Sequence, residues 1–169
     1  MACTIVRNAG KHATFESLTM MTTGPEWIAR IECQVDGDPR LIEGASVIAA
    51  HVSRRAGLSD AAASEIAAAA SQACGAAARV LGESGIPAGM KLAAAEFPDR
   101  IEVTIEPAPE ILKEFSAQFA SGASKRLADQ IRQSLKSAAV DELDVEINDG
   151  VPRIILVKKS GAAKRRFVF

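Results

Sequence analysis

The sequence predicts an α/β (α+β) protein, a two-layer sandwich in which a mixed, mostly antiparallel sheet carries its helices on one face. Three observations favour this fold class. Residues 59–82 have the 3.6-residue apolar periodicity of a long helix, several shorter stretches alternate like strands, and each expected helix has a single apolar stripe. Helices with one apolar stripe each are most simply buried against one face of a sheet.

The amino-acid composition limits the size of the core, the kinds of partner and the compartment. The 169 residues are 48% hydrophobic with a net charge of -1, which allows one sizeable core and argues against nucleic acid as a partner. The sequence contains no apolar run of membrane-spanning length and no signal-peptide pattern, so we expect no membrane partner. Cys3, Cys33 and Cys74 are odd in number and far apart, which argues against a disulfide framework or a zinc site and favours a cytoplasmic protein.

Residues 1–27 are interpreted as an N-terminal extension of undefined role. Within it, residues 2–7 and 15–21 are compatible with short strands, but polar, Gly and Pro residues lie between and after them. The main domain is expected over residues 28–159, and residues 160–169 form a basic tail.

The first clear elements are a strand over residues 28–35 and a helix over residues 40–55. Asp38 is the expected N-cap of this helix, Pro39 takes its first position and Gly57 ends it. His51 lies beside the apolar stripe, and we interpret it as a residue at the edge of the core because no second His or Cys stands at metal-ligand spacing.

The central helix runs from Ser59, a good N-cap, to Gly82. Alanine is the best helix former, and no proline interrupts the run. We expect this helix to be buried, with Cys74 packed and unreactive among the alanines. The stripe that should face the core consists of Ile66, Ala70, Ala73, Ala77 and Leu81.

The rest of the chain alternates between strands and helices. Residues 91–97 and 100–105 read as strands joined by a turn at Pro98 and Asp99. A short helix is expected over residues 110–119 and a longer one over residues 125–140. Residues 143–147 and 153–157 then predict a hairpin across an Asn-Asp-Gly turn.

Three stretches, LSDAAASEIAAAASQAC, DRIEVTIE and VDELDVEINDGVPRIILVKK, together with the order of elements, resemble the anti-sigma factor serine-protein kinases. This family is a branch of the histidine-kinase-like ATPase (Bergerat) fold, and the likeness covers residues 28–159. The resemblance implies binding of ATP and Mg²⁺, regulation of transcription through a sigma factor, phosphorylation of a serine on an anti-sigma factor antagonist, and a homodimer.

The residues at the family's functional positions depart from its pattern on the central helix. The resemblance implies a catalytic glutamate where this chain has Gln72, and an amide cannot take a proton at neutral pH. It implies a Mg²⁺-binding asparagine where this chain has Ala76, which offers no oxygen to a hard cation. Both changes predict weak or lost catalysis and metal binding.

The cofactor-binding loops also depart from the family. Glu106 stands where the resemblance implies an aspartate for the adenine amino group, and it remains an acceptor. The following glycine motif is replaced by Pro107, Ala108 and Pro109, which remove N–H donors and fix φ. Of the phosphate-binding glycine loop, the sequence retains Gly122 with Lys125 beyond it, at the start of an expected helix, where an anion would be favoured.

Two functions follow from the resemblance. The first is a degenerate member that acts by protein–protein binding to a sigma factor or an anti-sigma factor antagonist. The alternative is a divergent ATP-binding serine-protein kinase. A third reading, nucleic-acid binding, comes from the cations near the C-terminus, but a solvated tail or a lysine-guarded edge strand explains these residues more simply. They are Lys158, Lys159, Lys164, Arg165 and Arg166.

Overall fold

The computed structural model describes residues 3–7, 27–35, 38–115, 117, 124–135, 139–148 and 151–160. Its strands form one six-stranded sheet in the order β1-β2-β3-β4-β6-β5, and every neighbouring pair is antiparallel. The predicted class of helices on an antiparallel-rich sheet is therefore confirmed. The strands are β1 Cys3–Arg7, β2 Ala29–Val35, β3 Met90–Glu96, β4 Arg100–Pro107, β5 Glu142–Asn148 and β6 Val151–Lys159.

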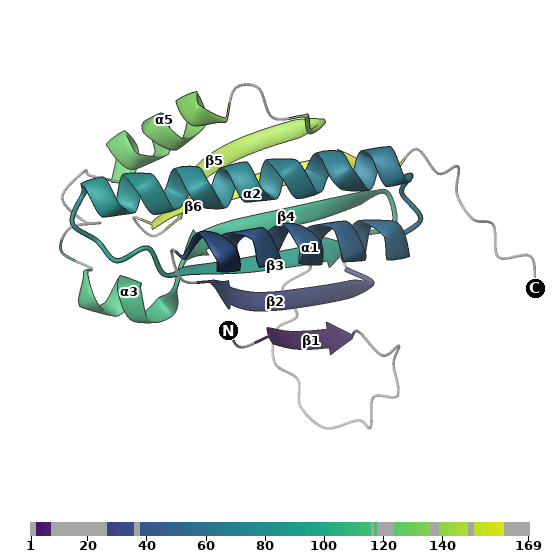
Figure 1. Ribbon diagram of the computed structural model, residues 1–169, viewed down its shortest axis with the longest axis horizontal. Helices are drawn as coiled ribbons and strands as arrows, with labels where there is room; N and C mark the ends of the chain where they lie inside the picture. The colour runs from purple at the N-terminus through teal and green to yellow at the C-terminus, as the bar shows by residue number, and fades with distance from the viewer. Residues whose placement is uncertain are drawn as a thin grey trace, which may run out of the picture.

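The long helices cover one face of the sheet (Figure 1). They are α1 Pro39–Arg55, α2 Asp60–Glu83 and α5 Ser124–Ser134. Helix α1 lies over β2 and β3, α2 lies beside α1 and packs chiefly on β4 and β6, and α5 covers β5 and β6. A one-and-a-half-turn helix, α3 Pro109–Glu114, follows β4 directly. No described helix covers the other face, which we call the open face.

The helix starts follow the capping chemistry that the sequence predicts. The side chain of Asp38 accepts from the Arg40 backbone N–H at 2.9 Å, and Ser59 accepts from the Ala62 N–H at 3.2 Å. Each bond satisfies a donor that has no partner within the helix. Gly57 follows α1 with φ of 86°, a conformation that glycine adopts without a steric cost.

The core forms where the small side chains of α2 meet the sheet. All five residues of the predicted stripe are at most 6% exposed, and Cys74 is fully buried. Burial raises the pKa of the Cys74 thiol to about 12, with a further contribution from Cys33, and the expected packing of this side chain in the core is confirmed. Opposite this stripe lie the largest buried side chains of the sheet, which are Met90, Leu92, Ile101, Ile105, Ile154 and Leu156.

Several sequence-based boundaries need correction. The helix expected over residues 110–119 is interrupted, because α3 ends at Glu114, where the N–H of Phe115 bonds to the Ile111 carbonyl, and Ala117 is helical again. The last helix ends at Ser134, whereas Val140 is not helical and leads into β5 through the Asp141 N–H, which bonds to the Val157 carbonyl at 3.0 Å. The expected strand over residues 15–21 and the tail after Ser160 lie outside the described residues.

The N-terminal segment contributes to the sheet. Strand β1 pairs with β2 and forms one edge, so part of the expected extension belongs to the same fold as the main domain. His51 is solvent-exposed on α1, further from the core than the sequence indicates. Within the described part of the chain, no helix has both the length and the apolar character required to cross a bilayer.

Candidate functional site

The expected catalytic and metal positions lie one turn apart on α2. Gln72 is exposed on the outer side of the helix, and Ala76 is 1% exposed and belongs to the core. Side chains four residues apart on an α-helix differ in direction by about 40°, and here this rotation leaves Gln72 facing solvent and Ala76 facing the core. The structure therefore does not bring these two side chains together as a polar pair.

A small apolar cavity lies beneath the C-terminal half of α2. Its volume is about 10 Å³, roughly the room that one water molecule needs, whereas ligand pockets measure about 300 Å³ or more. The residues around the cavity come from α2, α5, β3, β4 and β6. The cavity is lined by Ala77, Leu81, Met90, Ile105, Glu106, Pro107, Ile131, Pro152 and Ile154.

This packing bears on whether ATP and Mg²⁺ fit the expected site. A methyl group at position 76 gives a cation no ligand, and the neighbouring cavity has no room for a nucleobase. No group of three His, Cys, Asp or Glu side chains within the described ranges is placed to hold a metal ion. The residues present therefore do not fit Mg-ATP at this position in this conformation.

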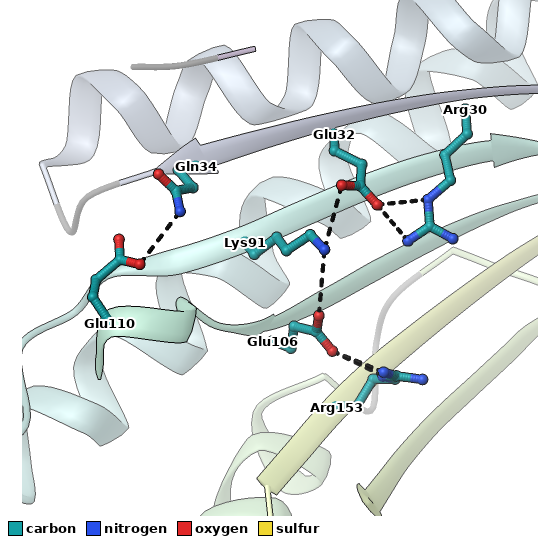
Figure 2. A network of polar contacts seen from close by, with 7 residues as sticks. All are labelled: Arg30, Glu32, Gln34, Lys91, Glu106, Glu110 and Arg153. Atoms are coloured by element: carbon teal, nitrogen blue, oxygen red, sulfur yellow. Dashed lines mark hydrogen bonds and ion pairs between the residues drawn. The ribbon is translucent and has the colours of Figure 1, made fainter. Parts of the chain in front are cut away.

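Glu106 takes part in a network of charges on the open face (Figure 2). Its Oε2 accepts from Arg153 Nε and lies 3.0 Å from Arg153 Nη2, and its Oε1 is 4.0 Å from Lys91 Nζ. Lys91 also lies 3.3 Å from Glu32, which pairs with Arg30 at 2.7 Å. The carboxylate expected to contact adenine is thus paired with two cations, on the other side of the sheet from Ala76.

The network affects the protonation of Glu32. Burial alone would raise the pKa of this carboxyl, but the neighbouring Arg30 and Lys91 outweigh burial and lower its pKa below the usual 4.5. An ionised carboxylate held between two cations is a poor general base because its proton affinity is reduced. The arrangement links β2, β3, β4 and β6 electrostatically.

The loop expected to approach adenine is tightly packed. Ala108 is 2% exposed, and its N–H bonds to the Gly89 carbonyl at 2.9 Å. A Cβ added at Gly89 would meet Ile111 at 3.0 Å, so α3 lies directly against this turn. The Gln34 side chain on β2 donates a hydrogen bond to the Glu110 carboxylate at 3.4 Å, which is a second contact between α3 and the sheet (Figure 2).

The expected phosphate-binding segment is only partly described. Gly122 lies outside the described residues. Lys125 is exposed in the first turn of α5, and Ser124 before it is 4% exposed. Of the C-terminal cations, Lys158 pairs with Glu65 at 2.7 Å and Lys159 pairs with Glu142 at 2.7 Å, while residues 164–166 lie outside the described part. Two members of the proposed basic cluster are therefore neutralised within the fold.

A second hollow, which the sequence does not reveal, lies between the C-terminal ends of α2 and α5. We call it the α2–α5 groove. Its volume is about 290 Å³, and it is shallow and largely open to solvent. Within the described residues, the side chains of Arg79, Glu83, Gln130 and Gln133 make no hydrogen bond or ion pair. The groove is lined by Arg79, Val80, Glu83, Gln130, Gln133 and Ser134.

The groove differs from the network in what its polar groups can do. A guanidinium, a carboxylate and two carboxamides offer both donors and acceptors to an incoming molecule. The spacing of Gln130 and Gln133 on α5 could have indicated a polar helix face, but only the packing of α5 on α2 brings Arg79 and Glu83 beside them. Comparisons of the chain with protein-family models and with curated proteins find no match.

Proposed function

We propose that this chain is an anti-sigma-factor-like regulatory protein that acts by protein–protein binding and has a degenerate ATP site. The observation that carries the proposal is Ala76, a buried methyl group at the position where the resemblance implies a Mg²⁺ ligand; the following residue, Ala77, lines a cavity of only about 10 Å³. The missing ligand oxygen and the small size of the cavity both support a degenerate ATP site. Regulation by binding remains the function that the resemblance supports.

The proposed partner is a sigma factor or an anti-sigma factor antagonist in the cytoplasm. The α2–α5 groove is the surface that we propose for contact, because four of its polar side chains make no hydrogen bond or ion pair within the described residues; these are Arg79, Glu83, Gln130 and Gln133. Free amide, guanidinium and carboxylate groups can bond to the main chain and side chains of a docked segment. Most of the charges of the open face, in contrast, are already paired with one another.

The test combines nucleotide and protein titrations. Calorimetry of the natural protein with Mg-ATP and with ADP should give no binding heat. Purified sigma factors and antagonists from the same genome should include at least one partner that binds. Arg79→Ala should weaken that binding by about tenfold or more, while Arg55→Ala, which removes an exposed cation of α1 outside the groove, should leave it unchanged.

The alternative function is a divergent serine-protein kinase. Lys125, an exposed cation in the first turn of α5, is the observation in its favour, because a helix N-terminus with a nearby cation attracts anions. Saturable Mg-ATP binding together with transfer of phosphate to an antagonist serine would establish the kinase and overturn the degenerate site. Absence of binding to every sigma factor and antagonist would overturn the regulatory role itself.

A further inference from the structure

The backbone of Val145, in the middle of the edge strand β5, is bonded to side chains through both of its polar groups. Its N–H donates to Asp144 Oδ1 at 2.7 Å, and its carbonyl accepts from Arg132 Nη2 of α5 at 2.6 Å. In an antiparallel ladder, the N–H and the carbonyl of one residue point to the same side of the strand. Since both groups of Val145 are bonded to side chains, they point away from β6 and towards the free edge.

The opposite strand supports the same orientation. Ile147, two residues further along β5, has its backbone groups on the same side as Val145 and is opposite Pro152 of β6. A proline has no N–H to donate, so a mutual pair of hydrogen bonds cannot form at this position. The outward polar groups of β5 therefore belong to Leu143, Val145 and Ile147, and Val145 is the central residue of the three.

We propose that Arg132 and Asp144 form an edge guard, a pair of side chains that closes β5 against strand addition by a second copy of this chain. A strand that joins an edge donates to its free carbonyls and accepts from its free N–H groups. At Val145 both groups are already bonded, so an incoming strand must first displace two side chains. The edge guard goes beyond the proposed function and does not depend on it.

The exposed side chain of Ile147 makes this edge attractive to a second copy. It is 45% exposed, and it lies on the same face of the sheet as Val145, which is 2% exposed in the core. Two β5 strands paired antiparallel about Val145 would place each Ile147 opposite a Leu143 and cover apolar surface on both copies. The edge therefore offers both backbone groups and apolar contact to another β5 strand once the edge guard is removed.

Arg132 is the member of the edge guard that comes from outside the strand. Helix α5 lies over β5 (Figure 1), and its Arg132 pairs with Asp129 through Nη1 at 2.9 Å while Nη2 bonds to Val145. The ion pair holds the guanidinium near the edge, and a hydrogen bond from a charged donor is stronger than one between neutral groups. Removing Arg132 frees the Val145 carbonyl without changing any residue of β5.

Sedimentation equilibrium tests the edge guard. Measurements in 1 M NaCl screen the exposed carboxylates of β5 from one another, so their repulsion does not mask the effect of the guard. Arg132→Ala should then self-associate at least about tenfold more tightly than the natural protein, because a charge-assisted bond no longer competes with the incoming strand. Asp144→Ala, which frees the N–H of Val145, should change the association in the same direction. Urea denaturation checks that both variants are folded.

Each variant has a matched control. Asp129→Ala removes the ion pair of Arg132 but not its bond to Val145. Glu146→Ala removes an exposed carboxylate from β5, as Asp144→Ala does, but frees no outward group of the strand. Both controls should associate no more tightly than the natural protein.

A proline at the edge shows whether the association uses β5. Ile147→Pro removes an outward N–H and leaves the ladder with β6 intact, so adding it to Arg132→Ala should abolish the gain. Association of Arg132→Ala or Asp144→Ala no tighter than that of the natural protein would overturn the proposal. An equal gain in the controls, or a gain that persists with Ile147→Pro, would overturn it as well.

Discussion

The face of the sheet beneath the helices and the open face opposite it differ in side-chain size, charge and packing. Beneath α2, alanines meet buried Leu, Ile and Met side chains and leave only a cavity of about 10 Å³. On the open face, carboxylates and cations alternate across the strands, and side chains such as Glu32 and Lys91 remain about a quarter exposed. One face depends on close packing, the other on partly hydrated ion pairs.

This difference indicates where the fold is vulnerable and where it tolerates change. Interiors packed at crystal-like density respond to a single added methylene, because neither side can move without strain. Partly exposed ion pairs contribute about 0 to 1 kcal/mol, since water screens them and ordering long side chains costs entropy. We therefore expect substitutions of equal size to have unequal effects on the two faces.

The largest effect should come from enlarging an alanine that faces the core. Ala73→Leu and Ala70→Leu replace fully buried methyl groups and should lower the free energy of unfolding by about 1 to 3 kcal/mol each through overpacking. Urea denaturation measures the change. Ala68→Leu, on the exposed side of the same helix, is the control and should be close to neutral. A stability equal to that of the natural protein in both core variants would contradict the packing described for α2.

A gain is expected on the outer side of α2. Gly75 lies within the helix, and a Cβ added there would have no heavy atom within 4 Å. Gly75→Ala should raise the free energy of unfolding by about 0.5 to 1 kcal/mol, because alanine restricts the unfolded chain and favours the helix. A thermal melt reports the shift. Destabilisation instead would mean that this side of α2 packs against something, such as a second copy of the chain.

A smaller loss is expected on the open face. Glu106→Gln removes the charge that faces Arg153 and Lys91 and should cost about 0.5 to 1 kcal/mol. Glu146→Gln is the matched control on β5, since Glu146 makes no ion pair within the described residues, and it should be neutral. Urea denaturation at low and high salt distinguishes the two, because added salt should narrow the difference. If Glu106→Gln lowered the free energy of unfolding as much as Ala73→Leu does, the two faces of the sheet would not differ in their sensitivity to substitution.

The smallest effect is a pH dependence from the same network. The pKa of Glu32 is lowered in the folded protein from its usual 4.5, so the unfolded chain binds its proton first as the pH falls. The stability that Glu32 contributes is present above pH 4.5 and is lost as the pH falls through the lower folded pKa. Urea midpoints between pH 7 and 3 should fall less steeply below 4.5 in Glu32→Gln. Parallel curves would show that this carboxylate is not held by its neighbours.

Local chemistry explains how much of this fold the sequence predicts. Helix caps at Asp38 and Ser59, the alanine stripe of α2 and the hairpin strands are encoded over a few residues, and the structure has them where expected. The predicted end of α5 was wrong because residues 135–140 have a helix-like composition. In the structure the helix ends at Ser134, and the Asp141 N–H bonds to the Val157 carbonyl of β6 just before β5 begins. Helical propensity is a weak prior against such tertiary contacts.

The candidate sites were less predictable because they depend on partners that are distant in sequence. The family positions on α2, Gln72 and Ala76, could be identified from the sequence alone. Nothing in the sequence around Glu106 shows that its carboxylate pairs with Arg153, which follows 47 residues later. The groove requires α5 to lie on α2, which no local sequence pattern specifies.

Strand β5, the edge opposite β1, carries carboxylates at every second position, Glu142, Asp144 and Glu146, all exposed. An unpaired strand edge is a template for another chain, and two such edges meeting along their length would bring these rows of negative charge together. The repulsion should keep copies of this protein from joining edge to edge near neutral pH. Acidification that protonates these carboxylates should weaken this barrier.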